Sequence, residues 1–296
     1  MDGPRRQKQI LIVGLGLIGG SLALALQGFE DYLVVGAVRS QATYDKAQAR
    51  AVAQRLSFDP AGELSQSDVV ILAQDPQGIM DFLWDNRDRF RPGSLVLDVC
   101  GVKTAIQQAA RCLPPTVDFI GCHPMAGKEV SGIDNAEATL FRNTHFIITP
   151  GQDSTPEHLA LLERMAAHCQ FRDVVRTTCQ RHDEMIAYTS QLMHVIALSV
   201  CDNEELFSCM GFEGGSFRDC TRVAALDVPL WTQLFTLNAP ALCRVVDQLE
   251  QRLRAYRLAI QAGDREGLAA MLERASERKK QRNFEQARGD DVRAPF

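Results

Sequence analysis

The sequence predicts an α/β fold, in which a doubly wound parallel sheet is followed by a second domain made only of helices. Up to about residue 175, short apolar runs typical of buried strands alternate with segments of helical pattern. Beyond that point long amphipathic patterns take over, and strand-like alternation stops. A chain of 296 residues is long enough for two cores. We therefore expect domains over residues 1–175 and 176–296.

Composition and charge narrow the class of protein. With 46% hydrophobic and 23% charged residues the chain resembles ordinary soluble proteins, and a net charge of -5 gives no reason to expect binding to nucleic acid. The nine cysteines contain no C-x-x-C pair, which argues against a zinc site and a disulfide framework, so we expect no metal and a cytoplasmic location. The apolar run over residues 10–26 follows three basic residues, as in a secretory signal, but its glycine spacing favours another interpretation.

The first strand, turn and helix are expected over residues 9–13, 14–19 and 20–29. The turn reads Gly14-Leu15-Gly16-Leu17-Ile18-Gly19, a G-x-G-x-x-G pattern between a strand and a helix. In a Rossmann-type domain the first two glycines allow a tight turn close to a pyrophosphate, and the third allows the helix to pack on the strand. These six residues are the predicted dinucleotide site.

The second strand, over residues 32–38, is expected to end at the adenosine ribose. An acid at that position would favour NAD, but the chain has Val38 followed by Arg39 and Ser40. A guanidinium and a hydroxyl favour NADP without excluding NAD; alternatively, Arg39 stacks on adenine or points to solvent. Asp75, beyond the next strand, is also assigned to the cofactor site.

The alternation then continues through the rest of the first domain. We expect helices over residues 43–55, 77–89 and 104–112, with strands over residues 68–73, 94–99 and 145–149, and a last helix and strand within residues 157–175. A strand over residues 117–120 leads into a loop that carries His123. Ligands of open parallel sheets bind beyond the carboxyl ends of the strands, so His123 is placed for chemistry; the alternative is a histidine that caps the sheet edge.

The helical domain is expected to contain helices over residues 180–207, 229–262 and 264–284. In the first of them Asp183, Ala187, Ser190 and His194 share one face. Buried polar groups need partners, so this face either lines a cleft against the first domain or forms a self-satisfied polar core.

A cluster of charge follows Gly214-Gly215. If residues 219–226 are helical, Arg218 and Arg222 are four apart and repel each other unless an anion lies beside them. The planar guanidinium matches a carboxylate at two points. The alternative is an ion pair between Asp219 and Arg222. Trp231, taken alone, is more typical of a structural residue.

Together these segments resemble one known family. The resemblance rests on GLGLIGGS (14–21), HPMAGKEVSG (123–132), residues 139–141 with 147–150, His182-Asp183 followed by His194, and residues 214–222 with Trp231 and Asn238. In order over residues 9–284, they look like the prephenate/arogenate dehydrogenase family. HPMAG and GGSFRDCTR are specific to it, whereas the glycine turn is not.

The resemblance implies NAD(P)-dependent oxidative decarboxylation of prephenate to 4-hydroxyphenylpyruvate, a step towards tyrosine, or conversion of arogenate directly to tyrosine. It implies a catalytic base at His123, a carboxylate-binding Arg222, and a His194 that positions the substrate or the nicotinamide. It also implies a homodimer formed through the helical domain. The substrate wall would include Arg218, Ser190, Glu129, Trp231 and Gly101.

The chain departs from the family pattern at two positions. Gly101 stands where many members have a serine near the substrate hydroxyl, so that contact is lost or is made by water or Cys100. Val38 stands where many NAD-using members carry an acid.

Two other functions are alternatives. A hydroxy-acid dehydrogenase of similar layout would use a lysine in the helical domain, but no lysine occurs between Lys128 and Lys279. A non-catalytic dinucleotide sensor that binds a protein partner would bind nucleotide without turnover.

Overall fold

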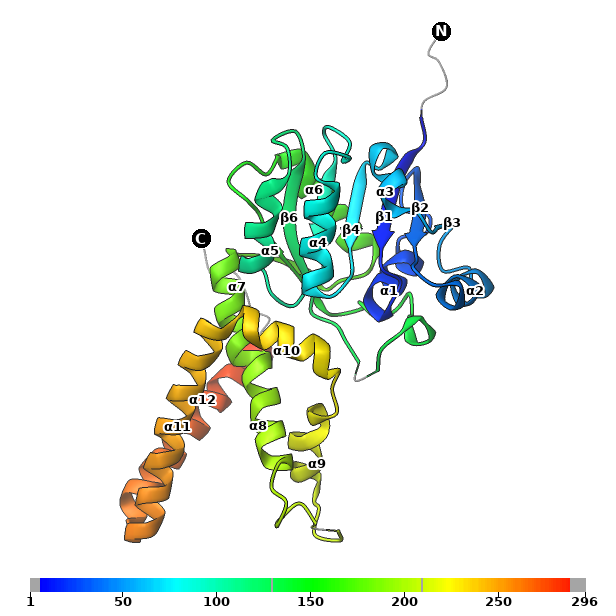
Figure 1. Cartoon of the computed structure of the whole chain (residues 1–296). Coiled ribbons are helices and arrows are strands. Elements are labelled where there is room, and N and C mark those ends of the chain that lie inside the picture. Colours follow the sequence, from blue (N-terminus) through cyan, green and yellow to red (C-terminus); the bar gives the residue numbers. More distant parts are fainter. Residues whose placement is uncertain (1–5, 129, 209, 288–296) are drawn as a thin grey trace. The chain divides into compact units, whose positions relative to one another are not determined.

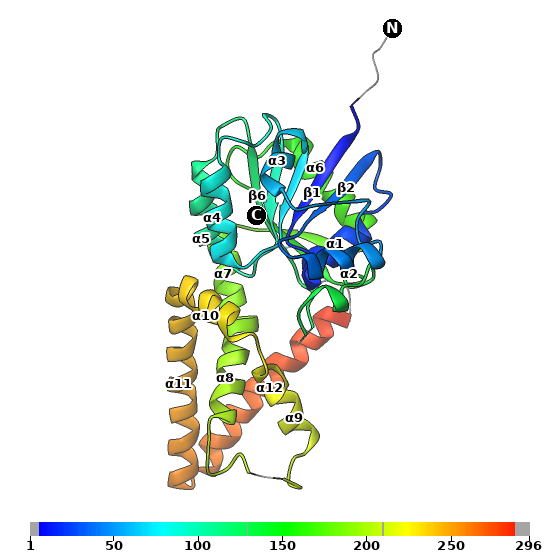
Figure 2. The same cartoon turned by 45° about the vertical axis from the view of Figure 1, so that its right-hand side comes forward.

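The first part of the chain folds around one eight-stranded sheet. The computed structural model describes residues 6–128, 130–208 and 210–287, with side chains up to residue 283. Across the sheet the strands lie in the order β3-β2-β1-β4-β5-β6-β7-β8. Figure 1 labels β3, β2, β1, β4 and β6 in this order from right to left, and Figure 2 shows the same sheet from another side. The strands are β1 (Lys8–Val13), β2 (Tyr32–Ala37), β3 (Arg55–Ser57), β4 (Val69–Leu72), β5 (Leu95–Asp98), β6 (Asp118–Pro124), β7 (His145–Thr149) and β8 (Asp173–Arg176).

Helices cover both faces of the sheet, which confirms the doubly wound α/β fold. One core joins the sheet to α1 (Leu17–Ala25), α2 (Gln41–Ala49) and α6 (Pro156–His168). The other core joins it to α4 (Pro76–Asn86) and α5 (Thr104–Ala109). The short helix α3 (Pro60–Glu63) contacts β1. Strand β1 is buried on both faces, as its continuous apolar run requires.

The sheet is not wholly parallel, which corrects the sequence-based expectation. Strand β7 pairs antiparallel with β6, through His123 opposite Ile147 and Pro124 opposite Phe146, while every other neighbouring pair is parallel. The segment between β6 and β7 contains only a short 3-10 turn (Ile133–Asn135) among its described residues. Without a crossover helix the chain returns in the opposite direction.

Strand β3 was not predicted, and the helix expected over residues 43–55 ends at its first residue. Helix α2 ends at Ala49, and Val52 follows as a buried residue before the chain turns back. Residues 55–57 then pair with β2 at the sheet edge.

The helical segments are shorter and more broken than predicted. The expected helix over residues 180–207 is α7 (Cys179–Ile186), a π-helical turn (Ala187–Gln191) and α8 (Leu192–Cys201). The expected helix over residues 229–262 divides at Asn238 into α10 (Val228–Leu237) and α11 (Ala239–Ala262). Helix α9 (Gly215–Thr221) begins before residue 219, and α12 (Arg265–Ala287) is the last helix described.

Contacts group the chain into two compact units that differ from the two expected domains. The first unit extends to Ala239 and therefore contains α7 to α10 as well as the sheet; the second begins at Pro240 and contains α11 and α12. Hydrogen bonds explain why α7 belongs with the sheet, because Asp183 accepts from the backbone N–H groups of Lys103 and Thr104 at the start of α5. None of the described helices is long and apolar enough to cross a membrane.

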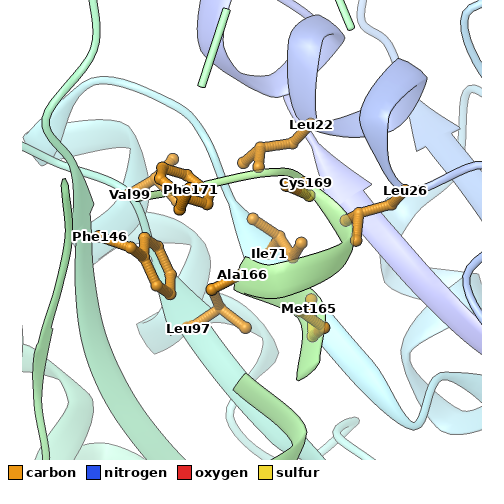
Figure 3. A pocket seen from close by; sticks show the side chains of 10 residues that line it. All are labelled: Leu22, Leu26, Ile71, Leu97, Val99, Phe146, Met165, Ala166, Cys169 and Phe171. Atoms are coloured by element: carbon orange, nitrogen blue, oxygen red, sulfur yellow. The ribbon is translucent and has the colours of Figure 1, made fainter. Parts of the chain in front are cut away.

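A small apolar cavity of about 20 Å³ lies in the core between the sheet, α1 and α6 (Figure 3). Its lining is entirely apolar and includes Leu22, Ile71, Phe146 and Met165. A space of this size without polar partners does not suit a cofactor or a charged substrate. The cavity is a packing gap in the apolar core.

Candidate active site

The glycine turn has the geometry that a nucleotide-binding turn requires. Gly14 has φ +98°, and a Cβ atom there would lie 2.8 Å from the carbonyl oxygen of Ala73. A Cβ atom at Gly19 would lie 1.9 Å from the carbonyl oxygen of Gly14, so that α1 packs this closely on the turn only with glycine. At Gly16 nothing lies within 4 Å, and the N-terminus of α1 has no side-chain cap. Open space at Gly16 and uncapped N–H groups are suited to a pyrophosphate.

The other residues of the turn contribute through their backbone. The side chains of Leu15 and Leu17 are buried, and Ile18 packs against the core. Their side chains therefore hold the turn to the sheet, while their peptide groups remain the part available to a cofactor.

The residues predicted at the cofactor site differ in whether their side chains already make hydrogen bonds within the protein. Arg39 is exposed and makes no hydrogen bond or ion pair with any residue that the structure describes. Ser40 caps α2, where its Oγ accepts from the backbone N–H of Thr43 at 3.2 Å. Asp75 caps α4, where it accepts from the N–H of Gly78 at 3.0 Å. Arg39 is thus the predicted ribose contact whose side chain has no structural role.

His123 lies inside β6 and not in the loop beyond it, which corrects the predicted strand end at residue 120. The pairing of β6 with β5 ends at Gly121, opposite Asp98, whereas its pairing with β7 continues to Pro124. His123 therefore still extends past the carboxyl end of β5, and the antiparallel partner holds its backbone. A side chain held by a strand is more precisely placed than one on a loop.

A chain of hydrogen bonds orients the His123 ring. Its Nδ1 lies 2.9 Å from Nε2 of His182, and Nδ1 of His182 lies 2.8 Å from the Asp183 carboxylate. The carboxylate accepts hydrogen bonds, so His182 carries its proton on Nδ1 and offers a lone pair at Nε2. His123 must then donate from Nδ1. The unprotonated Nε2 of His123 is left for a substrate proton.

The electrostatics favour this neutral state. Burial lowers the pKa of His123 well below its usual value, and the neighbouring His182 and Lys103 lower it further. Burial also lowers the pKa of His182, against the opposing effect of Asp183. Burial alone would raise the pKa of Asp183, but hydrogen bonds from His182 and the start of α5 bring it below the usual value. An ionised Asp183 beside two neutral imidazoles is the consistent state near pH 7.

A buried ion pair contacts the strand that carries His123. Lys103 forms an ion pair with Asp98, and both side chains are fully inaccessible to solvent. Lys103 also donates from Nζ to the carbonyl oxygen of Cys122 at 2.7 Å. Burial raises the pKa of Asp98 although Lys103 opposes the shift. Cys100 beside it has a pKa raised to about 12 by burial, so its thiol does not act as a base near neutral pH.

His194 and Trp231 form a second pair. Their ring centroids are 3.6 Å apart with planes inclined by 30°, and Nδ1 of His194 donates to the carbonyl oxygen of Ser190 at 3.0 Å. Partial burial lowers the pKa of His194. A neutral ring stacked on an indole, with a free Nε2, can accept or donate one hydrogen bond to a bound molecule.

The structure places the other predicted residues as follows. Arg218 lies on α9 and Arg222 directly after it, both exposed, in a segment that contacts α8. Gly101 is partly buried, and a Cβ atom there would meet Leu234 of α10 at 3.4 Å. Glu129 lies outside the described residues. Among the residues described, no group of three or more histidine, cysteine or acidic residues could hold a metal ion.

Sequence reasoning missed two residues that the structure brings to His123. His182 appears in the sequence pattern only as part of a motif. The polar face that begins at Asp183 was expected to line a cleft or to form a self-satisfied polar core, and in the structure Asp183 accepts hydrogen bonds at the start of α5. Lys103 was not singled out. The available signal was a lysine five residues after an aspartate at the end of a buried strand, because a charge in such a place needs a partner.

Family models match most of the chain. The model described as the nucleotide-binding domain of prephenate dehydrogenase matches residues 21–175, and the model described as the prephenate dehydrogenase dimerization domain matches residues 178–274.

Individual proteins and solved structures agree with these matches. The chain is 29% identical to cyclohexadienyl dehydrogenase of Zymomonas mobilis over 87% of this chain and 90% of that protein, and 27% identical to prephenate dehydrogenase of Lactococcus lactis over 90% and 75%. Arogenate dehydrogenase of Synechocystis matches with a TM-score of 0.79 and 29% identity over 92% of this chain and 99% of that one. Prephenate dehydrogenase of A. aeolicus, solved with hydroxyphenyl propionate and NAD+, matches with a TM-score of 0.84, covering 93% and 98%, and at 23% identity it shows the fold.

Proposed function

The chain belongs to the prephenate dehydrogenase family, and from this premise we propose that it converts prephenate and NAD(P)+ to 4-hydroxyphenylpyruvate, carbon dioxide and NAD(P)H. The observation that carries the proposal is the hydrogen-bonded chain from His123 through His182 to Asp183, which leaves a neutral imidazole with a free Nε2. The reaction needs such a base on the ring hydroxyl of the substrate.

In the proposed reaction His123 is the base, and the cofactor is the hydride acceptor. His123 takes the proton from the ring hydroxyl as the C–H bond at the same carbon breaks. A nicotinamide cofactor held at the glycine turn would supply the hydride acceptor, and loss of carbon dioxide from the substrate makes the ring aromatic. A base whose pKa lies below its usual value stays unprotonated near neutral pH, so no prior deprotonation is needed.

Substrate binding is assigned to the helices that follow the sheet. Arg222 binds a substrate carboxylate through its planar fork, and His194, stacked on Trp231, orients the substrate or the nicotinamide end. Arg218, Ser190, Gly101 and Glu129 complete the proposed wall. Arogenate is the second candidate substrate, because a relative solved from Synechocystis is an arogenate dehydrogenase with 29% identity. The two substrates differ only in an amino group against a keto group.

For the cofactor we infer a preference for NADP. The buried, apolar Val38 supplies no carboxylate to the ribose hydroxyls, and the exposed Arg39 has a free guanidinium for a 2′-phosphate. Arg39→Ala should therefore raise the KM for NADP+ and change the KM for NAD+ little. Equal changes for the two cofactors would contradict the preference.

The assembly is proposed to be a homodimer formed through the helical domain, with the domain boundary near residue 176. Support comes from the match of residues 178–274 to a dimerization domain, and the location proposed is the cytoplasm. Light scattering at several protein concentrations tests the dimer.

The deciding experiment measures initial rates of nicotinamide reduction at 340 nm with prephenate or arogenate and with NAD+ or NADP+. Wild-type protein should turn over prephenate, and His123→Asn should lower kcat by at least ~100-fold while the cofactor Kd stays unchanged. His168→Asn, which alters an exposed histidine of α6, is the matched control. Nucleotide binding without turnover of either substrate would favour the sensor function instead.

A further inference from the structure

Lys103 occupies a position where a lysine is rarely found. It is 1% exposed and directly precedes α5. Lysine side chains are almost never fully buried unless they are paired. The side chain of Lys103 is paired twice, with the Asp98 carboxylate at the end of β5 and with the carbonyl oxygen of Cys122 in β6, 2.7 Å away. So much desolvation at one residue calls for an explanation beyond the packing of the sheet.

The contacts of Lys103 reach both histidines of the site through their chain neighbours. Cys122 directly precedes His123, so the bond from Nζ to its carbonyl oxygen holds the strand at the base of the His123 side chain. Asp183 directly follows His182, and it accepts a 2.8 Å hydrogen bond from the backbone N–H of Lys103. One residue thus ties β6 and α7 together at the place where their two imidazoles meet.

We propose that Lys103 is a positioning residue of the reaction, which sets both the place and the charge environment of the His123–His182 pair. The inference rests on the proposed function, in which His123 is the base. It adds a charged group that neither touches the substrate nor belongs to the hydrogen-bonded chain of the histidines. The side chain acts through the Cys122 carbonyl oxygen and through its charge.

The charge acts in a defined direction. A buried positive charge disfavours protonation of a nearby imidazole, and Lys103 contributes in this direction to the lowered pKa of His123. The titratable and charged groups packed around the pair come from β5, β6, α5 and α7, and they are Asp98, Cys100, Lys103, Cys122, Cys179, His182 and Asp183. Among them Lys103 is the cation, so its removal should make His123 easier to protonate.

Two variants of the full chain test the proposal. Lys103→Met removes the charge and keeps most of the volume; whether Asp98 then takes up a proton or stays ionised, the positive charge is gone. The double variant Asp98→Asn/Lys103→Met replaces the whole ion pair by neutral groups and covers the case in which the single variant does not fold. Lys8→Met, at the start of β1, removes a lysine from the opposite end of the sheet.

The primary measurement is an NMR titration of the histidine rings in protein labelled with ¹⁵N-histidine, with His123 assigned from the spectrum of His123→Asn. In Lys103→Met the pKa of His123 should rise by about one unit. In the double variant it should rise by less, because the opposing charge of Asp98 is lost as well, and Lys8→Met should leave it unchanged. A His123 pKa that stays at the wild-type value in a folded variant would overturn the proposal. This titration needs no substrate, so it decides on Lys103 even where wild-type protein fails to turn over prephenate, a result that refutes only the proposed function.

The second measurement separates positioning from mere stability. The acid limb of the pH profile of kcat/KM should move to higher pH in the Lys103 variants by the same amount as the pKa of His123. A lower kcat with an unmoved acid limb would show that Lys103 only supports the fold, and would contradict the inference.

Discussion

His182 accepts a 2.9 Å hydrogen bond from His123, and the direction of that bond is set by the carboxylate of Asp183. Because hydrogen bonds from His182 and from the start of α5 hold the pKa of Asp183 below its usual value, its acceptor role persists across the neutral pH range. The proton positions of both imidazoles follow from this one anchored carboxylate. The base of the proposed reaction is therefore prepared by residues of α7 and α5 that need not touch the substrate.

His182→Phe should lower kcat by at least ~10-fold, since the ring keeps its volume but loses the acceptor that selects the tautomer of His123. The cofactor Kd should not change. Stopped-flow measurement of the chemical step, together with fluorescence titration of the cofactor, checks both expectations. An unchanged kcat would mean that His123 finds its tautomer without His182.

Local patterns account for what the sequence predicted well. The first strand, glycine turn and first helix follow one another without a break, so the pattern alone identifies them. The direction of β7 could not be predicted, because a buried apolar strand reads the same in parallel and antiparallel pairing. Strand β3 has only three residues, and its pairing with β2 defines it as a strand more than its own pattern does.

The candidate site was predictable only in part, for a similar reason. His123 stood out because it follows an apolar run, but its partner His182 lies 59 residues further along the chain. The spacing of Lys103 from Asp98 is a local signal for an ion pair, but the carbonyl oxygen of Cys122, the second partner of the buried lysine, meets it only in the folded sheet. Local sequence indicates which groups are capable of chemistry, and the fold decides which of them meet.

Two glycine substitutions in the nucleotide turn should affect different properties, one the stability of the fold and the other the binding of the cofactor. Gly19→Ala places a methyl group against the carbonyl oxygen of Gly14 and should lower the free energy of unfolding by about 2 kcal/mol or more. Gly16→Ala meets nothing within 4 Å and should leave stability unchanged, but its methyl group stands where the pyrophosphate approaches, so the cofactor KM should rise by roughly 10-fold. Urea unfolding and cofactor kinetics separate the two. Equal stability losses would contradict the assignment.

Gly101→Ser tests the position at which many family members carry a serine. The added Cβ atom makes an ordinary contact with Leu234 at 3.4 Å, so the fold should tolerate it. The hydroxyl adds a donor and an acceptor beside the proposed substrate hydroxyl, and kcat/KM for prephenate should rise several-fold, by roughly the worth of one hydrogen bond. Gly101→Ala is the matched control, because it fills the same space without the hydroxyl. A similar gain in the alanine variant would assign the effect to packing.

Arg222→Ala should raise the substrate KM by about 10 to 100-fold and change kcat less, because it removes a charge-assisted contact made in the ground state as well as in the transition state. Arg222→Lys restores the charge without the planar fork, and should recover only part of the loss. Arg218→Ala, four residues earlier and also exposed, shows whether both arginines take part. A wild-type KM in Arg222→Ala would remove this residue from the carboxylate site.

Stability should fall as the pH drops below about 6.5, the usual histidine pKa in an unfolded chain. Both His123 and His182 have a lowered pKa in the folded protein, so below that pH the unfolded chain binds more protons than the native state. For each such histidine the free energy of unfolding falls by up to about 1.4 kcal/mol per pH unit. Above the histidine pKa of the unfolded chain this loss is absent. Asp98, whose pKa is raised, acts in the opposite direction at lower pH, so variants must isolate the histidine contribution.

Urea unfolding of wild-type protein and of His123→Asn/His182→Asn between pH 5 and pH 8 gives that contribution as the difference in slope. The double variant should lose less free energy of unfolding per pH unit, since it lacks both histidines whose pKa is lowered in the folded protein. His168→Asn controls for the loss of an exposed histidine. Parallel curves for wild-type protein and the double variant would show that the two buried imidazoles take up protons in the folded state as readily as in the unfolded chain, and the neutral base proposed for His123 would then have no basis.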